Sequence, residues 1–290
     1  MSAPSTAQTA TLLVSCPDRR GLVAALGQLL YGHGVNILDA DQHTDADAGL
    51  FFQRFRMDLR ELHTDRFSFE AAIAEVAERF SMKFRLAYGD QPRRVAILVS
   101  KFDHCFHDLL LRHRAGELAC AIPLIISNHP DLESAAKAYG VPYHFVPAPG
   151  GDKAAQEAAV IALLEKENID LVVLARYMQI LSPDFCARYL GRMINIHHSF
   201  LPAFVGGKPY HQAFERGVKI IGATAHYVTQ DLDQGPIIEQ DVTRVSHRDS
   251  VADMIRKGRD LERNVLSRAV RVHIEDRVLI SGNKTVVFDY

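Results

Sequence analysis

The sequence predicts an α/β protein with an N-terminal ferredoxin-like α+β domain and a second, doubly wound domain with a mostly parallel sheet. In residues 1–90, short strands and amphipathic helices follow the order β-α-β-β-α-β. In residues 93–290, continuous apolar runs are separated by helical patterns, as expected for buried parallel strands with crossover helices. The polar, turn-rich residues 89–92 lie between these patterns and mark the predicted domain boundary.

The elements of the first domain follow from local patterns. An apolar strand at residues 11–15 is followed by a turn at 18–21. A helix over residues 22–31 then ends before Gly34, a typical stop residue. The remaining predicted elements are a strand beginning at 35–38, a half-buried strand at 51–59, a helix at 67–80 and a closing strand at 83–88.

The second domain has longer apolar runs with less alternation. The predicted doubly wound pattern continues to about residue 269 or beyond, and the tail at 271–290 reads as a helix end plus two short strands around 281–283. The apolar runs expected to form strands lie at residues 95–99, 122–126, 171–175, 193–197 and 222–228, and the helical patterns at 109–118, 132–139 and 153–167.

The amino-acid composition of the chain argues against several classes of function. The 290 residues carry a formal net charge of -2, which argues against general binding to nucleic acid or to a membrane surface. No apolar run approaches the roughly 20 residues that cross a bilayer, and residues 1–10 lack a secretory pattern, so we expect a cytoplasmic protein. The cysteines form no Cys-x-x-Cys pair, and we expect reduced structural thiols.

Asn195 and His197 form the first candidate catalytic pair. In a strand, residues two apart face the same side, so the amide and the imidazole are expected to lie together. They come near the carboxyl end of the predicted strand, where open α/β sheets bind ligands. Both side chains could equally make ordinary hydrogen bonds at a strand end, and the pair alone does not decide between these interpretations.

Asp233 adds a carboxylate in a glycine-bearing loop after the predicted strand at 222–228. Taken alone, it is explained as a turn residue. Together with Asn195 and His197 it fits formyl transfer or hydrolysis. An amide N–H can stabilise an oxyanion, an imidazole can move protons near neutral pH, and a carboxylate can accept a proton from the nucleophile. This chemistry alone indicates a hydrolase without a defined substrate.

Two motifs give these residues a family context. Residues 195–202 read Asn-Ile-His-x-Ser-x-Leu-Pro, and residues 226–236 read His-x-Val-x-x-x-Leu-Asp-x-Gly-Pro. Through these two motifs, residues 93 to about 245 resemble the formyltransferase domain shared by glycinamide ribonucleotide formyltransferase and its relatives. The resemblance implies that Asn195 stabilises the formyl oxygen, that His197 assists proton transfer, and that Asp233 organises water and the imidazole.

The resemblance also implies a folate site, with no metal and no prosthetic group. Residues 175–183 resemble the pterin-contacting segment of the family. His198, His226 and Gly235 are expected to support the site, and Lys208 would place a basic group near the polyanionic folate tail. The backbone expected to bracket the folate head group belongs to Met178, Gln179, Ile180 and Leu181 on one side and to Thr229, Gln230 and Asp231 on the other.

One departure from the family concerns the acceptor of the formyl group. The nucleotide-dependent transferases carry a glycine-rich phosphate loop after their first strand, whose backbone N–H groups cradle the phosphate. Residues 100–106 here contain no glycine and include Asp103. We therefore expect water to be the nucleophile, with Asp103 and His104 helping to exclude a phosphorylated acceptor.

The first 90 residues resemble an ACT domain, a small-molecule regulatory module. Asp18, Gly21 and Asn36 match its ligand-loop positions, although the same residues could simply build the turn and cap the helix. The resemblance implies a small amino acid as effector. Because ACT domains often pair their sheets edge to edge, it also implies a homo-oligomer.

An ACT domain followed by this formyltransferase domain is the arrangement of the formyltetrahydrofolate deformylase family. His198, residues 209–213 and residues 256–262 also resemble that family. The resemblance implies a hydrolase that splits the linear amide C–N bond of 10-formyltetrahydrofolate into tetrahydrofolate and formate. That reaction supplies formate to purine synthesis and balances the one-carbon folate pool. Asp233 would activate water directly or through His197.

Three other functions stay open at this point. Formyl transfer to an amine would give acceptor-dependent turnover, and an amino-acid sensor with an inactive catalytic domain would bind its ligand without folate turnover. A metal hydrolase is suggested by His197, His198, His211 and His226. Adjacent residues on a strand point to opposite faces, however, so His197 and His198 are not expected to share an ion.

Overall fold

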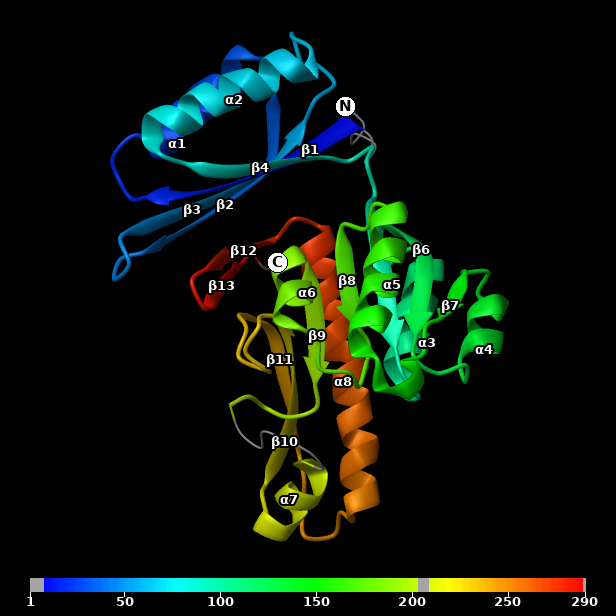
Figure 1. Ribbon diagram of the computed structural model, residues 1–290. Helices are drawn as coiled ribbons and strands as arrows, with labels where there is room; N and C mark the ends of the chain where they lie inside the picture. The colour runs from blue at the N-terminus through cyan, green and yellow to red at the C-terminus, as the bar shows by residue number, and fades with distance from the viewer. Residues whose placement is uncertain (1–7, 203–208, 289–290) are drawn as a thin grey trace. The chain divides into compact units, whose positions relative to one another are not determined.

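The computed structural model describes residues 8–202 and 209–288 (Figure 1). The chain divides into two compact units. The first contains the residues up to Pro92 together with Asp276–Ser281 and the residues from Val286 onward, and the second contains Arg93–Glu275 and Gly282–Thr285. Within the described residues, no helix is both long enough and apolar enough to cross a membrane.

The first unit is a four-stranded antiparallel sheet in the order β2-β3-β1-β4, covered on one face by two helices. This confirms the predicted ferredoxin-like order. Leu22, Leu26 and Leu30 are buried on one stripe of the first helix, because residues four apart share a helix face. The elements are β1 (Thr9–Pro17), α1 (Leu22–Gly32), β2 (Asn36–Asp45), β3 (Leu50–Asp58), α2 (Arg66–Phe80) and β4 (Lys83–Tyr88).

The other face of this sheet is covered by the C-terminal part of the chain. Leu13 and Phe52 pack against Phe288, with Leu279 and Val286 beside them. These last residues belong to a hairpin of β12 (Val278–Ser281) and β13 (Lys284–Val287). The sequence predicts the two short strands, but their side-chain pattern does not say which sheet they cover.

The candidate effector residues lie at opposite ends of the first sheet. Asp18 and Gly21 follow the carboxyl end of β1, where Pro17 is level with Asp45 of β2 through Leu50 of β3. Asn36 begins β2, and the same register places it beside the other end of β1. With a rise of about 3.3 Å per residue, roughly 25 Å of sheet separates the two positions. One chain therefore does not bring Asp18 and Asn36 together.

The second unit contains a seven-stranded sheet in the order β11-β10-β9-β8-β5-β6-β7. The strands from β9 to β7 are parallel, and β10 pairs antiparallel with both β9 and the edge strand β11. The strands are β5 (Arg93–Val99), β6 (Cys120–Ser127), β7 (Tyr143–Phe145), β8 (Leu171–Leu174), β9 (Met193–His197), β10 (Ile220–Tyr227) and β11 (Ile237–Arg244).

Helices cover this sheet, and the longest of them, α8, packs along β9, β10 and β11 (Figure 1). It begins with a reciprocal capping box between Ser250 and Asp253, which satisfies donors at the helix start. The helices are α3 (His104–Arg114), α4 (Glu133–Ala138), α5 (Lys153–Lys166), α6 (Pro183–Arg188), α7 (Pro209–Arg216) and α8 (Val251–Ile274), with a short 3₁₀ turn at Pro149–Gly151.

The predicted helix at 109–118 was wrong in its bounds, because α3 begins five residues earlier and ends at Arg114. Cys105 and Phe106 supply the first buried turn, and Gly116, with a φ of 79°, ends the helical backbone before Leu118. The sequence interpretation also did not identify β7, α6 or β11. These are short or half-exposed elements with weak periodicity.

The strand order places a crevice beside the central strand β5. From β5 the chain runs outward through β6 and β7, then returns to β8 and β9 on the other side. Such a switch point opens a crevice at the carboxyl ends of the strands. Ser100 follows β5 there: it accepts a hydrogen bond from the backbone N–H of Met178 at 3.0 Å and donates to Asn128 at 2.7 Å.

Candidate active site

Two neighbouring strands and one loop bring the predicted catalytic side chains together. Asn195 and His197 lie on β9, and His226 lies on β10, directly opposite Asn195 in the antiparallel register. Asp233 comes from the loop between β10 and β11, where its φ of 55° turns the backbone. Sheet pairing thus fixes three of the four positions, and the turn delivers the carboxylate.

Asp233 is the centre of a connected set of polar contacts. Its Oδ2 lies 3.1 Å from His197 Nδ1. Its Oδ1 lies 3.5 Å from His226 Nε2 and accepts from the Asn195 amide nitrogen at 3.4 Å. Both carboxylate oxygens are therefore occupied by groups of the protein.

The charge of Asp233 is strongly stabilised. Burial alone would raise the pKa of the carboxyl, but the hydrogen bonds from His197 and His226 outweigh it and hold the pKa well below its usual range. A carboxylate of such low pKa is a weak base. Its geometry suits an orienting role toward the imidazole instead.

The two ring nitrogens of His197 have different surroundings. Nδ1 faces Asp233, so the hydrogen of the neutral ring is held on Nδ1. Nε2 is buried and has no hydrogen-bond partner among the described residues, and the side chain lines a cavity of this unit. A buried nitrogen without a protein partner is available to a ligand.

The amide of Asn195 is oriented by its neighbours. Its nitrogen contacts His226 Nε2 at 3.3 Å as well as Asp233. His226 is itself fixed, because its Nδ1 donates to the carbonyl of Tyr227 at 2.9 Å. An amide nitrogen carries two hydrogens, so one can be held by Asp233 and His226 while the other faces the cavity.

The cavity has a volume of about 610 Å³ and contains most of the predicted folate segments. Met178, Ile180 and Leu232 line it with exposed fractions of 53%, 65% and 57%, so a ligand could cover substantial apolar surface there. Of the other predicted folate residues, those lining the cavity are Gln179, Leu181, Thr229 and Gln230. Asp231 lies in the same loop but does not line it.

Two further predicted residues have clear local positions. A Cβ added at Gly235 would lie 1.8 Å from the carbonyl oxygen of Tyr227, so only glycine allows this loop to pack against β10. His198 lies just after the end of β9, and its ring lines the same cavity as His197. Residues 206–208, with the predicted basic group of Lys208, lie outside the described residues.

The sequence interpretation did not single out a second polar cluster, which forms another part of the cavity wall. Its centre is Glu262 of α8, which is 1% exposed. Glu262 accepts from Tyr210 at 2.9 Å, contacts His104 Nε2 at 2.8 Å and lies 3.5 Å from the Arg176 guanidinium. Burial would raise the pKa of Glu262, but the contacts with His104 and Arg176 outweigh it, and the carboxyl pKa is lowered.

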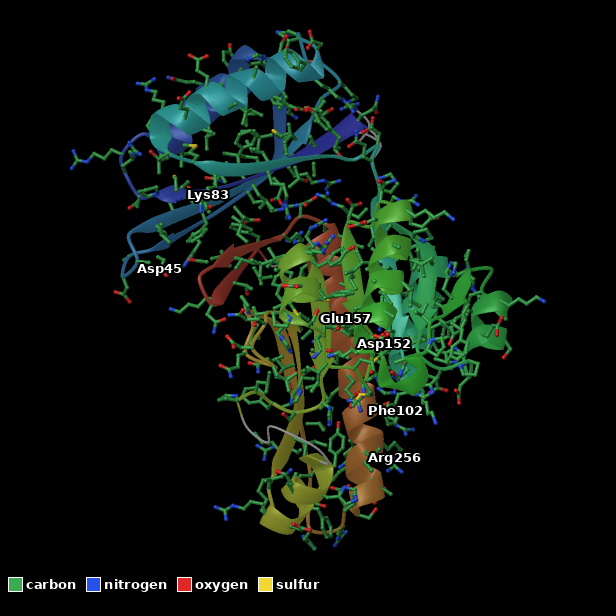
Figure 2. The ribbon with its side chains drawn as sticks, in the orientation of Figure 1. Asp45, Lys83, Phe102, Asp152, Glu157 and Arg256 are labelled. Atoms are coloured by element: carbon green, nitrogen blue, oxygen red, sulfur yellow. The ribbon has the colours of Figure 1, made fainter. Side chains whose placement is uncertain are left out.

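The backbone of Arg176, another member of this cluster, is strained. It has a φ of 64°, a left-handed conformation that disfavours residues with a Cβ. Its guanidinium lies 4.8 Å from the ring centre of Phe102, which is labelled in Figure 2. Close packing also constrains Gly258, because an added Cβ would lie 1.9 Å from the Tyr210 hydroxyl. Backbone strain and tight packing together favour a functional wall over an incidental one.

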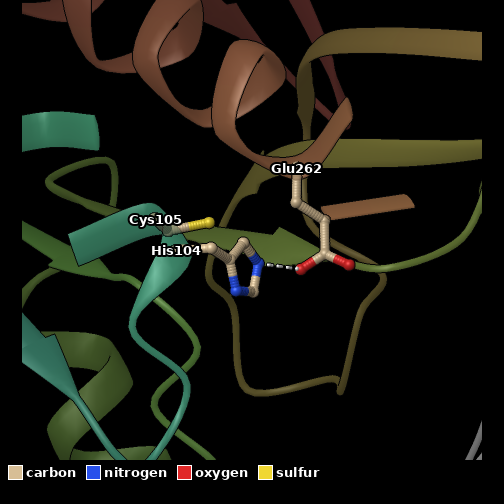
Figure 3. Close-up of side chains that lie close together, drawn as sticks. All are labelled: His104, Cys105 and Glu262. Carbon is tan, nitrogen blue, oxygen red and sulfur yellow. Dashed lines mark hydrogen bonds and ion pairs between the residues drawn. The ribbon is translucent and has the colours of Figure 1, made fainter. Parts of the chain in front are cut away.

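His104, Cys105 and Glu262 bring potential metal-ligand atoms within 4.8 Å of one another (Figure 3). The surroundings fit a hydrogen-bonded network better than a cation site. Burial, and then the charge of Glu262, raise the pKa of the Cys105 thiol well above its usual value, and a protonated thiol binds metals poorly. The guanidinium of Arg176 beside Glu262 further opposes a cation.

Two families match the chain. Residues 93–270 match the formyl transferase family, and residues 10–79 match the ACT domain family. Among curated relatives, a formyltetrahydrofolate deformylase from Synechocystis is 56% identical over 97% of this chain and 98% of its own length. One from Bacillus subtilis is 48% identical over 96% of this chain and 93% of its own length.

Solved structures agree with this result. A formyltetrahydrofolate deformylase from Pseudomonas syringae has a TM-score of 0.95 and 51% identity, covering 97% of this chain and 94% of its own. A glycinamide ribonucleotide transformylase from Symbiobacterium toebii has a TM-score of 0.65 and 32% identity, covering 68% of this chain and 95% of its own. The shorter enzyme thus shares only part of the chain.

Proposed function

The chain belongs to the formyltetrahydrofolate deformylase family, and on that premise we propose that it hydrolyses 10-formyltetrahydrofolate to tetrahydrofolate and formate at Asn195, His197 and Asp233. The observation that carries this assignment of the site is the contact between His197 Nδ1 and Asp233, which leaves His197 Nε2 without a protein partner in the cavity wall. Folate is the substrate, and the reaction needs no prosthetic group.

His197 is the base that the geometry favours. Asp233 has both oxygens engaged and a depressed pKa, so it orients His197 and stabilises its protonated form. In the proposed step, the water oxygen bonds to the formyl carbon while one water proton moves to His197 Nε2. The tetrahedral intermediate then collapses: the C–N10 bond breaks, N10 receives the proton from His197, and formate leaves.

Asn195 is the proposed oxyanion donor. Its amide nitrogen is held from one side by Asp233 and His226, which leaves a second N–H for the formyl oxygen. Because the donor is fixed before the reaction, it can stabilise charge in the transition state without reorganisation.

Asn195→Ala is expected to lower kcat by about 10²–10³-fold, since removal of a single oxyanion donor has an effect of this size. KM for the folate should change much less. Steady-state formate release measures both constants. Asn264→Ala, an exposed amide on α8, serves as the matched control, and an Asn195 variant as active as this control would exclude the oxyanion role.

The proposed folate site lies between the segment after β8 and the loop after β10. The exposed apolar side chains of Met178, Ile180 and Leu232 support it, because a pterin and its aromatic ring could cover them. We assign Thr229 and Gln230, which line the cavity, to the second side of the head group, through backbone contacts; Asp231 lies in the same loop but outside the cavity wall. His198, His226 and Gly235 support the site from the positions described above.

An assay without an amine acceptor tests the function directly. Purified protein mixed with 10-formyltetrahydrofolate should release formate and tetrahydrofolate in equal amounts. Turnover that requires an added amine would instead indicate a transferase. Loss of activity with a chelator, restored by a divalent metal, would point to a metal hydrolase.

We further propose that the first unit binds a small amino-acid effector between two copies of the chain. Because Asp18 and Asn36 lie at opposite ends of one sheet, an effector that touches both needs a second chain. This supports a homo-oligomer. Gly21, with a φ of 89° and open space beside it, leaves room for a ligand at the loop.

The free thiols of the described residues agree with the proposed cytoplasmic location.

An amino-acid effector is expected to raise the melting temperature, since a ligand at a hundredfold excess over Kd stabilises the folded state by about 2.7 kcal/mol. Thermal-shift measurements across the amino acids should identify it. Asp18→Ala should abolish the shift, whereas Asp47→Ala, an exposed carboxylate between β2 and β3, should keep it. No shift with any amino acid would refute the proposed effector class.

A further inference from the structure

His198 lies beside His197, the proposed base. Strict alternation along a strand would point His197 and His198 to opposite faces, but β9 ends at His197 and the chain bends there. The two rings are 5.2 Å apart between centres and tilted by 36°, and both line the cavity. The ring centre of Tyr210 lies 6.1 Å from that of His198.

The ring nitrogens of His198 have no hydrogen-bond partner within the part of the chain that the structure describes. The side chain is half-buried in the cavity wall, beside His197 Nε2, which also has no protein partner. Polar groups in such places generally bond to a ligand or to water. The remaining hydrogen-bonding capacity of His198 is thus directed at whatever fills the cavity beside His197.

The surroundings keep His198 uncharged. Burial, and then the nearby Arg176, lower the pKa of the imidazole to about 4. Glu262, His197 and Asp233 also act on it, and Tyr210 packs beside it. A neutral imidazole has one nitrogen that accepts a hydrogen bond, whereas a protonated imidazole only donates.

We propose that His198 binds the attacking water and aligns it with the formyl carbon, next to the His197 nitrogen that takes its proton. This inference rests on the proposed function, since it names the residue that holds the nucleophile of that reaction. In the arrangement, one water hydrogen is donated to His198 and the other to His197 Nε2. Both hydrogens are then held, and an oxygen lone pair faces the carbon.

The polar wall around Glu262 has a part in this arrangement. Arg176, fixed between Glu262 and Phe102, presents a buried positive charge to His198 and opposes its protonation. A protonated His198 would donate to the water oxygen and occupy the lone pair needed for attack. The strained backbone of Arg176 is accounted for if its side chain must remain in this wall.

A competition between water and hydroxylamine tests the proposal. His198→Ala is expected to lower kcat for formate release by about 10–100-fold, since misplacing a reactant has an effect of this order. KM for the folate should stay within about twofold. Hydroxylamine attacks without a fixed water, so the ratio of formohydroxamate to formate should rise by about the same factor as hydrolysis falls.

Two further variants separate positioning from simple structural damage. His198→Gln keeps a hydrogen-bond acceptor and should recover most of the lost kcat, while His247→Ala, an exposed histidine before α8, should behave as wild type. Melting temperature and folate binding confirm that each variant is folded.

Equal loss of water attack and hydroxylamine attack in His198→Ala, which leaves the product ratio unchanged, would overturn the proposal. Failure of the proposed function is recognised separately. In that case the wild-type protein itself would release no formate from 10-formyltetrahydrofolate, whatever residue 198 is.

Discussion

Asp233→Asn is expected to lower kcat for formate release by about 10³–10⁴-fold, with a smaller effect on KM. Asparagine has nearly the same size and tolerates the left-handed backbone at this position, so the loop should keep its shape. It lacks the charge that stabilises a protonated His197, and its NH₂ group can force the imidazole into the wrong tautomer. In a histidine–aspartate pair of known mechanism, this substitution has an effect of that size.

The same variant should change the dependence of stability on pH. The pKa of Asp233 is depressed in the folded state, so the carboxylate stabilises the fold above its unfolded value of about 3.9. This stabilisation is lost as the pH falls through the depressed pKa. Melting temperatures of wild type and Asp233→Asn should therefore differ most at neutral pH and converge in strong acid.

Asp184→Asn is the matched control for both measurements, since Asp184 is exposed on α6 and does not line the cavity. Its kcat and melting temperature should equal those of the wild type. If Asp233→Asn retained more than about a tenth of wild-type kcat, the carboxylate would not be orienting the base, and the pairing of His197 with Asp233 would be only structural.

Much of the site could be predicted because its members occupy regular positions. Asn195 and His197 are two residues apart on a strand, and the strand end of an α/β sheet is where such a pair meets ligand. His226 followed from the neighbouring strand. Asp233 required the family motif, because a carboxylate in a turn has no periodicity that would indicate where its side chain lies.

The polar wall could not be predicted in the same way. Arg176 and Glu262 meet only when α8 packs onto the sheet, and charged residues on a helix are normally expected to face solvent. The direction of the His198 side chain could not be predicted, because the alternation rule applies only while the strand continues and β9 ends one residue earlier. In both cases the deciding contact is between distant or irregular segments, which local patterns do not encode.

His197→Ala is the second variant with a large expected effect, a fall in kcat of about 10³–10⁴-fold. The residue is assigned both proton transfers, from water and to N10, and general acid–base catalysis contributes up to about this amount. The proposed folate site lies on other segments, so KM should change little. Formate release in single-turnover experiments measures the chemical step, and His247→Ala provides the folded control.

The double variant decides which residue is the immediate base. If Asp233 acts only through His197, removing the imidazole also removes the benefit of the carboxylate, and His197→Ala with Asp233→Asn should be about as slow as His197→Ala alone. If Asp233 instead deprotonated water itself, each change would lower kcat independently and the losses would multiply. The 3.1 Å contact between His197 and Asp233, with both carboxylate oxygens occupied, favours the first outcome.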